Sequence, residues 1–406
     1  MNILMISDVY FPRVNGVSTS IQTFTESLLA QGHTVTLIAP EYPEKTEDDF
    51  TIIRIPSKKL PFDPEDRLMS KRAIKKMLPE LSRQQFDLVH IQTPFVAHYA
   101  GVYLAENLGI PSVVSYHTYF EAYFEKYLPW LPSGLLRKVA RKYSASQCNK
   151  VDGIVSPSSQ MLNKLREYGA TTRASIIPTG LKLENYDKVD VNGFRNKYGI
   201  REDETVLLYV GRVAHEKNIP FLIDVFVEVL EHNSDVKFVI AGEGPAQKAL
   251  INRAAVLDLE EHIVFVGYLD RQTELIDCYK SADLFVFSSE TETQGLVLLE
   301  AMACGLPVVS VASMGSKDVL VDGQGCLIAD LEIQDFTDKV QSILTDLAYA
   351  KQLSDSGREY VQRWSAADKA AEMLAFYEMV IKEASSPNSI EINNDVQSEA
   401  LRNEIS

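Results

Sequence analysis

Short runs of apolar residues, rich in valine and isoleucine, recur along the first 180 residues and alternate with helical patterns. Nearly continuous apolar runs of this length are typical of strands that helices cover on both faces. Strands and helices in alternation predict a parallel, doubly wound sheet. The predicted strands are residues 2–7, 34–39, 51–55, 86–91, 112–117, 153–157 and 174–178, with helices between them, for example at 17–31 and 133–150.

The second half of the chain repeats this arrangement. We therefore expect an α/β protein with two Rossmann-like, doubly wound domains that face each other across a cleft. The expected domains are residues 1–180 and 199–363, joined by a polar hinge at 181–198 and followed by a helix at 364–384 and a disordered tail at 385–406. The second domain is predicted to contain strands 205–211, 236–242, 262–267, 283–288 and 306–311, and helices near 218–232, 246–258, 271–281 and 295–304.

The composition is that of a globular enzyme. Of the 406 residues, 46% are hydrophobic and 24% are charged, which excludes a wholly disordered chain. The sequence contains no run of eighteen apolar residues, so we expect no membrane-spanning helix. The N-terminal residues lack the features of a signal peptide. The four cysteines are scattered without a CxxC pair, so we expect a reduced, cytoplasmic protein without a zinc site.

Charge is distributed unevenly along the chain. The net charge of -16 argues against nucleic acid as a partner. Residues 1–180 hold 20 Lys and Arg against 17 Asp and Glu, whereas the rest of the chain holds 20 against 39. This difference in charge indicates either that two domains have different partners or only that each domain achieves solubility with a different surface charge.

Ligands on such sheets bind beyond the carboxyl ends of the strands, so the loops there are the candidate sites. The first of these loops carries Gly16 directly before a helix that opens with Ser18. Free N–H groups at a helix start suit a phosphate, although a simple turn glycine is the alternative. The loop lacks the GxGxxG pattern, which argues against a nicotinamide cofactor.

The loop after residues 205–211 has the sequence GRVAHEKN and carries two cations, Arg212 and Lys217. A planar guanidinium and a lysine point charge together suit a diphosphate. An exposed basic turn, or Arg212 paired with Glu216, is the alternative. The next such loop, GEGP, places Gly244 in a tight turn where the backbone approaches closely.

The segment SSETETQGLVLLEAMACGLPVV is the most informative, because it carries Glu292 and Glu300 eight residues apart. Gly295, Leu296 and Val297 open a helix whose first N–H groups can receive a phosphate. Glu300 can accept from two vicinal ribose hydroxyls, and Glu292 can reach hydroxyls of a sugar beyond the diphosphate. The alternative is that Glu300 is a buried structural carboxylate and Glu292 faces solvent.

His117 ends the predicted strand at 112–117. A histidine at the carboxyl end of a strand, facing the cleft, can donate to a substrate hydroxyl or phosphate. The alternative is a packed histidine, which is our interpretation of the other six. These are His33, His90, His98, His215, His232 and His262.

Taken together, five motifs resemble the retaining glycosyltransferases of family 4. They are VNGVS around Gly16, SYHTYF around His117, GRVAHEKN, GEGP and the Glu292-x7-Glu300 segment, and the resemblance covers about residues 1–382. It implies the GT-B fold, in which the second domain binds a nucleotide-sugar and the last helix returns to the first domain. The expected packing stripe of that helix comprises Ala367, Ala371, Leu374, Ala375 and Phe376.

The resemblance also implies roles for individual residues. Arg212 and Lys217 would clamp the diphosphate, Glu300 would bind the ribose, and Glu292 would contact the donor sugar. Gly16 would lie beside the pyrophosphate, and His117 near the C6 hydroxyl of the donor sugar. The remaining expected donor-binding residues are Gly244, Gly295, Leu296 and Val297.

The variant TETQGLVLLEAMA resembles a subgroup that includes glucosyltransferases acting on diacylglycerol, so UDP-glucose is the expected donor. Thr293-Gln294-Gly295 stands where much of the family has Gly-Phe-Gly, which leaves the donor sugar open. No Asp-x-Asp is present, and we expect neither a metal nor a cofactor. Cations and a helix N-terminus would stabilise the leaving diphosphate in a front-face substitution that retains the anomeric configuration.

Two segments of the first domain predict contact with a lipid. Residues 66–81 predict one amphipathic helix, and such a basic helix can lie on an anionic membrane. The alternative is that its apolar stripe packs on the sheet, and both can hold at once. Its apolar residues are Ile74, Met77, Leu78 and Leu81, and its cations are Lys71, Arg72, Lys75 and Lys76.

Residues 118–142 carry aromatic residues, among them Tyr119, Phe120 and Trp130, beside a basic cluster. This combination suits a membrane interface or a lipid-lined groove. A helical hairpin that uses the aromatic residues as core is the alternative.

We therefore expect a glycosyltransferase with a membrane-lipid acceptor, in the cytoplasm and peripheral on the inner face of the cell membrane. Transfer to a soluble sugar, sugar phosphate or polyol is the first alternative. A non-catalytic nucleotide-sugar-binding module is the second, and the set of Arg212, Lys217, Glu292 and Glu300 disfavours it. A nicotinamide oxidoreductase is a distant alternative.

Overall fold

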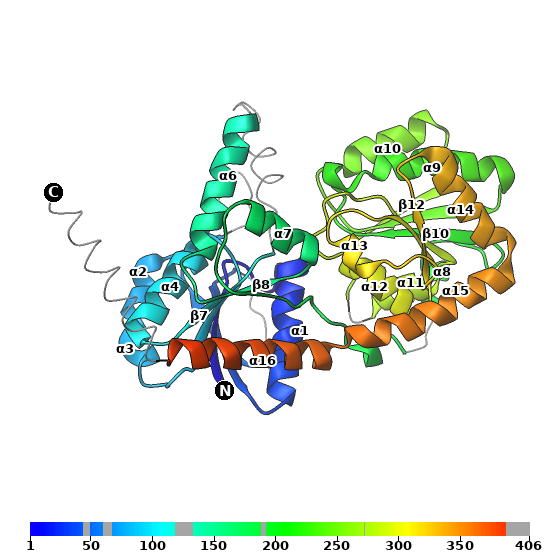
Figure 1. Ribbon diagram of the computed structural model, residues 1–406. Coiled ribbons are helices and arrows are strands. Elements are labelled where there is room, and N and C mark those ends of the chain that lie inside the picture. Colours follow the sequence, from blue (N-terminus) through cyan, green and yellow to red (C-terminus); the bar gives the residue numbers. More distant parts are fainter. Residues whose placement is uncertain (44–48, 60–66, 118–132, 188–191, 272, 387–406) are drawn as a thin grey trace. The chain divides into compact units, whose positions relative to one another are not determined.

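The computed structural model describes residues 1–43, 49–59, 67–117, 133–187, 192–271 and 273–386. The chain divides into two compact units (Figure 1). Unit 1 comprises Met1–Gly180 together with the C-terminal segment from Ala366, and unit 2 comprises Leu181–Ser365. The described part of the predicted hinge belongs to unit 2, and the predicted tail lies outside the described residues from position 387 onward.

Unit 1 contains a seven-stranded sheet in which every neighbouring pair is parallel. The apolar runs therefore form the predicted doubly wound sheet. The strand order reverses between β1 and β6, which places the topological switch point there. From one edge to the other the strands are β3 (Thr51–Ile55), β2 (Thr34–Pro40), β1 (Asn2–Ile6), β6 (Leu88–Ile91), β7 (Ser112–Ser115), β8 (Gly153–Ser156) and β9 (Ala174–Ile176).

Helices cover both faces of this sheet, so alternate strand residues enter two separate cores. Ile3 and Met5 pack in the core that includes α1 and α16, whereas Leu4 and Ile6 pack in the core that includes α4. Burial on both faces is the reason that these strands read as continuous apolar runs. The longer helices of the unit are α1 (Gly16–Ala30), α4 (Val96–Leu108), α6 (Ser133–Cys148), α7 (Ser159–Glu167) and α16 (Ala366–Ala384).

The C-terminal helix α16 packs against α1, as the family resemblance implies (Figure 1). Its predicted packing stripe is wrong, because only Phe376 of the five expected residues is fully buried. The large side chains set the face that is buried, and the alanines of the predicted stripe, at 367, 371 and 375, are exposed beside it. The buried residues are Ala366, Ala370, Met373, Phe376, Tyr377 and Val380.

His90 fixes α16 to the sheet. Its Nδ1 lies 2.5 Å from the hydroxyl of Tyr377 on α16, and its Nε2 lies 2.9 Å from Ser115 Oγ on β7. Burial lowers the pKa of His90 to about 3, so the ring is neutral at pH 7. The packed interpretation of His90 agrees with these contacts.

The segment 66–81 is not one helix, contrary to the prediction. It contains β5 (Arg67–Met69), which pairs with β4 (Ser57–Lys59), and then α2 (Lys71–Lys76) and α3 (Leu78–Leu81). Pro79 lacks the N–H that a continuing α2 would donate to Lys75 O, so a new helix begins at Leu78 with the proline in its first turn. Ile74 and Leu81 are buried in the unit 1 core, as the packing alternative requires.

Unit 2 contains a six-stranded parallel sheet whose order reverses between β10 and β13. Sequence analysis missed β15, which is a four-residue strand after two glycines. The strands are β12 (Ile263–Gly267), β11 (Val236–Ala241), β10 (Thr205–Val210), β13 (Leu284–Phe287), β14 (Val308–Val311) and β15 (Cys326–Ala329).

The helices of unit 2 include the four that were predicted, each shorter than predicted by one to four residues in total. They are α8 (Asn192–Lys197), α9 (Ile219–His232), α10 (Gln247–Val256), α11 (Glu274–Lys280), α12 (Leu296–Ala303), α13 (Ser316–Val319), α14 (Ile333–Thr345) and α15 (Leu347–Tyr360). Within the described ranges of both units, each helix is too short or too polar to cross a membrane. All four cysteines are buried free thiols.

Candidate functional site

The switch point of unit 2 brings together two loops that are far apart in the sequence. Because β10 and β13 are neighbours, the loop after β10 meets the loop after β13. Lys217 Nζ forms an ion pair with Glu292 Oε1. The Lys217 side chain is 19% exposed to solvent and that of Glu292 is 15% exposed. A cation and a carboxylate thus meet where ligands bind on sheets of this type, and both remain accessible.

Arg212 lies on the same loop as Lys217 and is exposed. The alternative in which it pairs with Glu216 is not observed, since no described residue forms an ion pair with the Arg212 guanidinium. Arg212 therefore offers its five N–H donors at the mouth of the sheet.

Glycines allow the loops after β10 and β11 to pack closely. A Cβ atom on Gly244 would lie 2.3 Å from the carbonyl oxygen of Val213, and one on Gly242 would lie 2.0 Å from that of Gly211. Val213 also donates its N–H to Glu243 O at 2.9 Å. The GEGP sequence therefore supports the shape of the loop that carries Arg212 and Lys217.

The start of α12 faces the same region. Gly295 precedes the helix at a φ of +91°, a conformation that favours glycine, and Leu296 and Val297 are partly exposed. Sequence analysis missed Gly315, whose N–H donates to Glu292 O at 2.8 Å. A Cβ on Gly315 would lie 2.1 Å from Thr293 O, so this glycine lets the loop after β14 support the loop that carries Glu292.

Glu300 lies inside α12 with 1% of its side chain exposed, and both of its carboxylate oxygens are engaged. Oε1 is ion-paired with Arg271, and Oε2 accepts from the hydroxyl of Tyr279 at 2.9 Å. The attraction of the Glu300 carboxylate raises the pKa of Arg271 above its usual value. These contacts fit the structural alternative for Glu300, and a ribose reaches the carboxylate only where Arg271 gives way.

Sequence analysis did not identify Arg271 and Tyr279, because each lies in a predicted helix and belongs to no recognisable motif. The sequence carries one hint, since a carboxylate predicted inside a helix that packs on a parallel sheet requires a buried counter-ion.

In unit 1, Gly16 lies at the start of α1, is exposed, and has open space around its Cβ position. The side chain of Asn15 accepts from Ser18 N–H and caps the helix. The switch point itself holds a buried carboxylate, Asp8, which accepts from Thr93 Oγ1 and from the N–H groups of Phe95 and Ala97. Burial raises the pKa of Asp8 to about 6, and its contacts identify it as the cap of α4.

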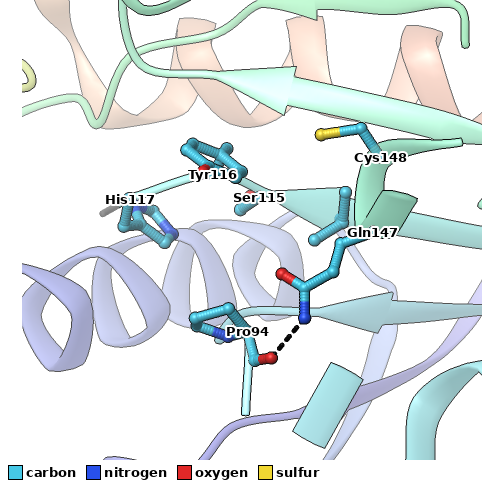
Figure 2. A pocket seen from close by; sticks show the side chains of 7 residues that line it. Pro94, Ser115, Tyr116, His117, Gln147 and Cys148 are labelled. Atoms are coloured by element: carbon cyan, nitrogen blue, oxygen red, sulfur yellow. Dashed lines mark hydrogen bonds between the residues drawn. The ribbon is translucent and has the colours of Figure 1, made fainter. Parts of the chain in front are cut away.

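His117 lines a small pocket at the carboxyl end of β7, with room for about one water molecule. Figure 2 shows this pocket, with His117 on one side, Gln147 on the other and Pro94 below them. Burial lowers the pKa of His117 to about 4, so the ring is neutral at pH 7. Its Nε2 lies 3.3 Å from Gln92 Oε1 and donates to it, which makes Nδ1 an acceptor rather than the expected donor.

The four cations of the predicted membrane surface are all exposed on α2. Lys71 Nζ lies 5.0 Å from the centre of the Tyr99 ring, and Lys75 Nζ lies 4.5 Å from that of Tyr103. Two lysines and two tyrosines, each four residues apart, thus form a cation–π ladder between α2 and α4. Tyr119, Phe120 and Trp130 lie outside the described residues. Among the residues with described positions, no cluster of three His, Cys, Asp or Glu side chains has the arrangement of a metal site.

Two family models match the chain. Residues 14–185 match the model described as Glycosyltransferase Family 4, and residues 190–360 match that of Glycosyl transferases group 1.

Similar proteins include two alpha-monoglucosyldiacylglycerol synthases. That of Streptococcus pneumoniae is 34% identical over 76% of this chain and 71% of its own length, and that of Acholeplasma laidlawii is 30% identical over 76% and 80%. A GDP-mannose-dependent alpha-mannosyltransferase of Mycolicibacterium smegmatis is 27% identical over 82% and 85%.

Among solved structures, sucrose-phosphate synthase from Thermosynechococcus elongatus superimposes with a TM-score of 0.75 at 21% identity. The superposition covers 94% of this chain and 99% of that one. At this identity the likeness establishes the architecture, two Rossmann-like sheets in the expected order.

Proposed function

Because the chain belongs to the family 4 glycosyltransferases, whose fold is GT-B, we propose that it transfers glucose from UDP-glucose to a membrane lipid such as 1,2-diacylglycerol. The contact between Lys217 and Glu292 at the unit 2 switch point carries this proposal. It joins a cation suited to the diphosphate to a carboxylate suited to the hydroxyls of the sugar beyond it.

Lys217 can serve both groups at once. Its ammonium group has three N–H donors, so one can bond Glu292 while two remain for phosphate oxygens. Arg212 and the first N–H groups of α12 add donors for the same diphosphate. Glu300 would hold the ribose once Arg271 has been displaced, and Gly16 would contact the pyrophosphate. His117 Nδ1 would accept a hydrogen bond from a hydroxyl of the sugar.

In the proposed reaction, the acceptor hydroxyl attacks the anomeric carbon on the face from which the diphosphate departs. The new glycosidic bond forms as the bond from that carbon to the phosphate oxygen breaks. The departing phosphate oxygen takes the proton of the acceptor, so the products are a glycoside of retained configuration and a nucleoside diphosphate. Arg212, Lys217 and the helix N-terminus stabilise the charge that develops on the diphosphate.

A screen of donors and acceptors tests the proposal. UDP-glucose and GDP-mannose are each supplied with vesicles containing 1,2-diacylglycerol or with soluble sugars, sugar phosphates and polyols. We expect nucleoside diphosphate release and an α-linked glycolipid with UDP-glucose and vesicles only. Turnover with soluble acceptors alone would support the soluble-acceptor alternative. Turnover with GDP-mannose instead of UDP-glucose would show that GDP-mannose is the donor, and binding without turnover would indicate a non-catalytic module.

We expect transfer to persist in excess EDTA. The proposed site offers two cations and a helix N-terminus to the leaving diphosphate, which is the charge that a divalent metal would otherwise supply. The measurement is the initial rate with and without EDTA. Complete loss, restored by added Mg²⁺ or Mn²⁺, would contradict a metal-independent reaction.

We expect a variant with glutamine in place of all four cations to bind anionic vesicles more weakly and UDP as tightly as the wild type. The four positions are Lys71, Arg72, Lys75 and Lys76. Each cation near an anionic surface contributes about 1 kcal/mol, so the four together change the partition coefficient by about a hundredfold or more. Vesicle flotation at low salt measures this change, and added salt should reproduce it in the wild type.

The matched control exchanges lysine and arginine at the same four positions, which preserves the charge. This variant should float with the vesicles like the wild type. If the wild type ignores anionic vesicles at low salt, the soluble-acceptor alternative becomes the preferred one.

A further inference from the structure

Two buried hydroxyl groups lie beneath the loop that carries both proposed diphosphate-binding cations. Tyr209, on β10, donates from its hydroxyl to Arg212 O at 3.1 Å. Ser288, directly after β13, donates to Asn218 O at 3.0 Å and lies 3.3 Å from Lys217 O. Both side chains are fully buried, so neither can touch a ligand.

The surroundings of Tyr209 are arranged so that its hydroxyl reaches the loop. Its ring stacks on Phe287 of the neighbouring strand, with 5.8 Å between ring centres and 13° between ring planes. The hydroxyl lies only 2.9 Å from the position that a Cβ on Gly211 would occupy, so a larger residue there would push it away. The bond to Arg212 O therefore depends on both a stacked ring and a glycine.

The turn at Lys217 depends equally on a group from outside the loop. Asn218 has a φ of +53°, in the left-handed region that asparagine adopts more readily than most residues other than glycine. Pro220 has no N–H, so it cannot donate to Lys217 O from three residues onward. Ser288 offers its single hydroxyl hydrogen to the backbone at this point, closer to Asn218 O than to Lys217 O, and Glu292, on the same loop as Ser288, binds the side chain of Lys217.

We infer that Tyr209 and Ser288 are positioning residues, which hold the backbone at Arg212 and Lys217 so that the two cations face one diphosphate. The inference rests on the proposed function. The hydroxyls act through the cations, so their effect on nucleotide binding should disappear when the cations are absent.

The experiment compares Tyr209→Phe and Ser288→Ala with two control variants in unit 2, Tyr360→Phe and Ser310→Ala. The controls also remove one buried hydroxyl each. That of Tyr360 donates to Val319 O at 2.8 Å and that of Ser310 to Val311 O at 3.0 Å, and neither acceptor belongs to the loop that carries the two cations. Thermal unfolding and calorimetric binding of UDP and GDP are measured for each. We expect similar losses of stability in all four variants, but about fivefold to tenfold weaker binding of the preferred nucleotide only in the first two, as for one lost hydrogen bond.

Double variants identify the route of the effect. Ser288→Ala in a Lys217→Ala background, and Tyr209→Phe in an Arg212→Ala background, should bind the nucleotide no more weakly than the cation variants alone. Additive losses, or losses equal to those of the controls, would overturn the inference. If Lys217→Ala and Arg212→Ala themselves bind like the wild type, the proposed diphosphate site fails first and the inference falls with it.

Discussion

Alanine at both Arg212 and Lys217 is expected to remove nearly all binding of the nucleotide-sugar and nearly all turnover. Hydrogen bonds between charged groups contribute about 1.5–3 kcal/mol each, so the loss of two corresponds to about a hundredfold to ten-thousandfold weaker binding. Turnover should fall further, because these cations also stabilise the charge that develops on the leaving diphosphate. Calorimetry with UDP and initial rates with UDP-glucose measure the two effects.

The structure supplies a matched control for this variant. Arg253 and Lys339 also lie in unit 2 and form ion pairs, with Asp224 and Asp335, but they lie outside the proposed site. Alanine at both should leave UDP binding and turnover at the wild-type level. A double variant at Arg212 and Lys217 that folds and retains near wild-type turnover would rule out the diphosphate assignment.

Glu300→Gln is expected to reduce both the stability of unit 2 and its affinity for UDP. The substitution leaves Arg271 without its carboxylate, and breaking a buried ion pair costs about 3–5 kcal/mol, less here because Arg271 is about one-third exposed. Loss of the charged acceptor for the ribose adds about 1.5–3 kcal/mol to the binding free energy. Chemical unfolding and calorimetry measure the two quantities separately.

A second variant separates the ion pair from the ribose contact. Replacing a buried ion pair by neutral groups of similar volume is often neutral for stability, so Arg271→Met combined with Glu300→Gln should recover most of the lost stability. UDP affinity should stay low, because the carboxylate is still absent. If this double variant binds UDP like the wild type, Glu300 is a structural carboxylate, as its present contacts with Arg271 and Tyr279 alone would indicate.

Much of the fold follows from local properties of the chain. Runs such as NILMI and VKFVIA are nearly continuous in apolar residues because helices bury both faces of each sheet, and they mark β1 and β11 to within a residue or two. Loops after such strands are where a doubly wound sheet binds ligands, so the sequence by itself determined that Arg212, Lys217 and Glu292 lie at the same edge.

Other features depend on contacts that no local pattern contains. The pairing of Lys217 with Glu292, 75 residues later, requires β10 and β13 to be neighbours, which is a property of the strand order. Arg271 and Tyr279 meet Glu300 through tertiary contacts between the α11 region and α12. Likewise, His117 Nε2 donates its proton to Gln92, which lies in the loop after β6. Contacts between side chains so far apart in the sequence are determined by the packing of the whole unit.

The two errors in predicted helices have different origins. In 66–81 the helical periodicity extends across Pro79, but the backbone restriction at that proline divides the segment, and its first residues pair with β4 instead. In α16 two apolar stripes lie side by side, and the sequence does not distinguish them. Tertiary packing chose the face with Met373, Phe376 and Tyr377, because larger side chains bury more apolar area against the sheet and α1.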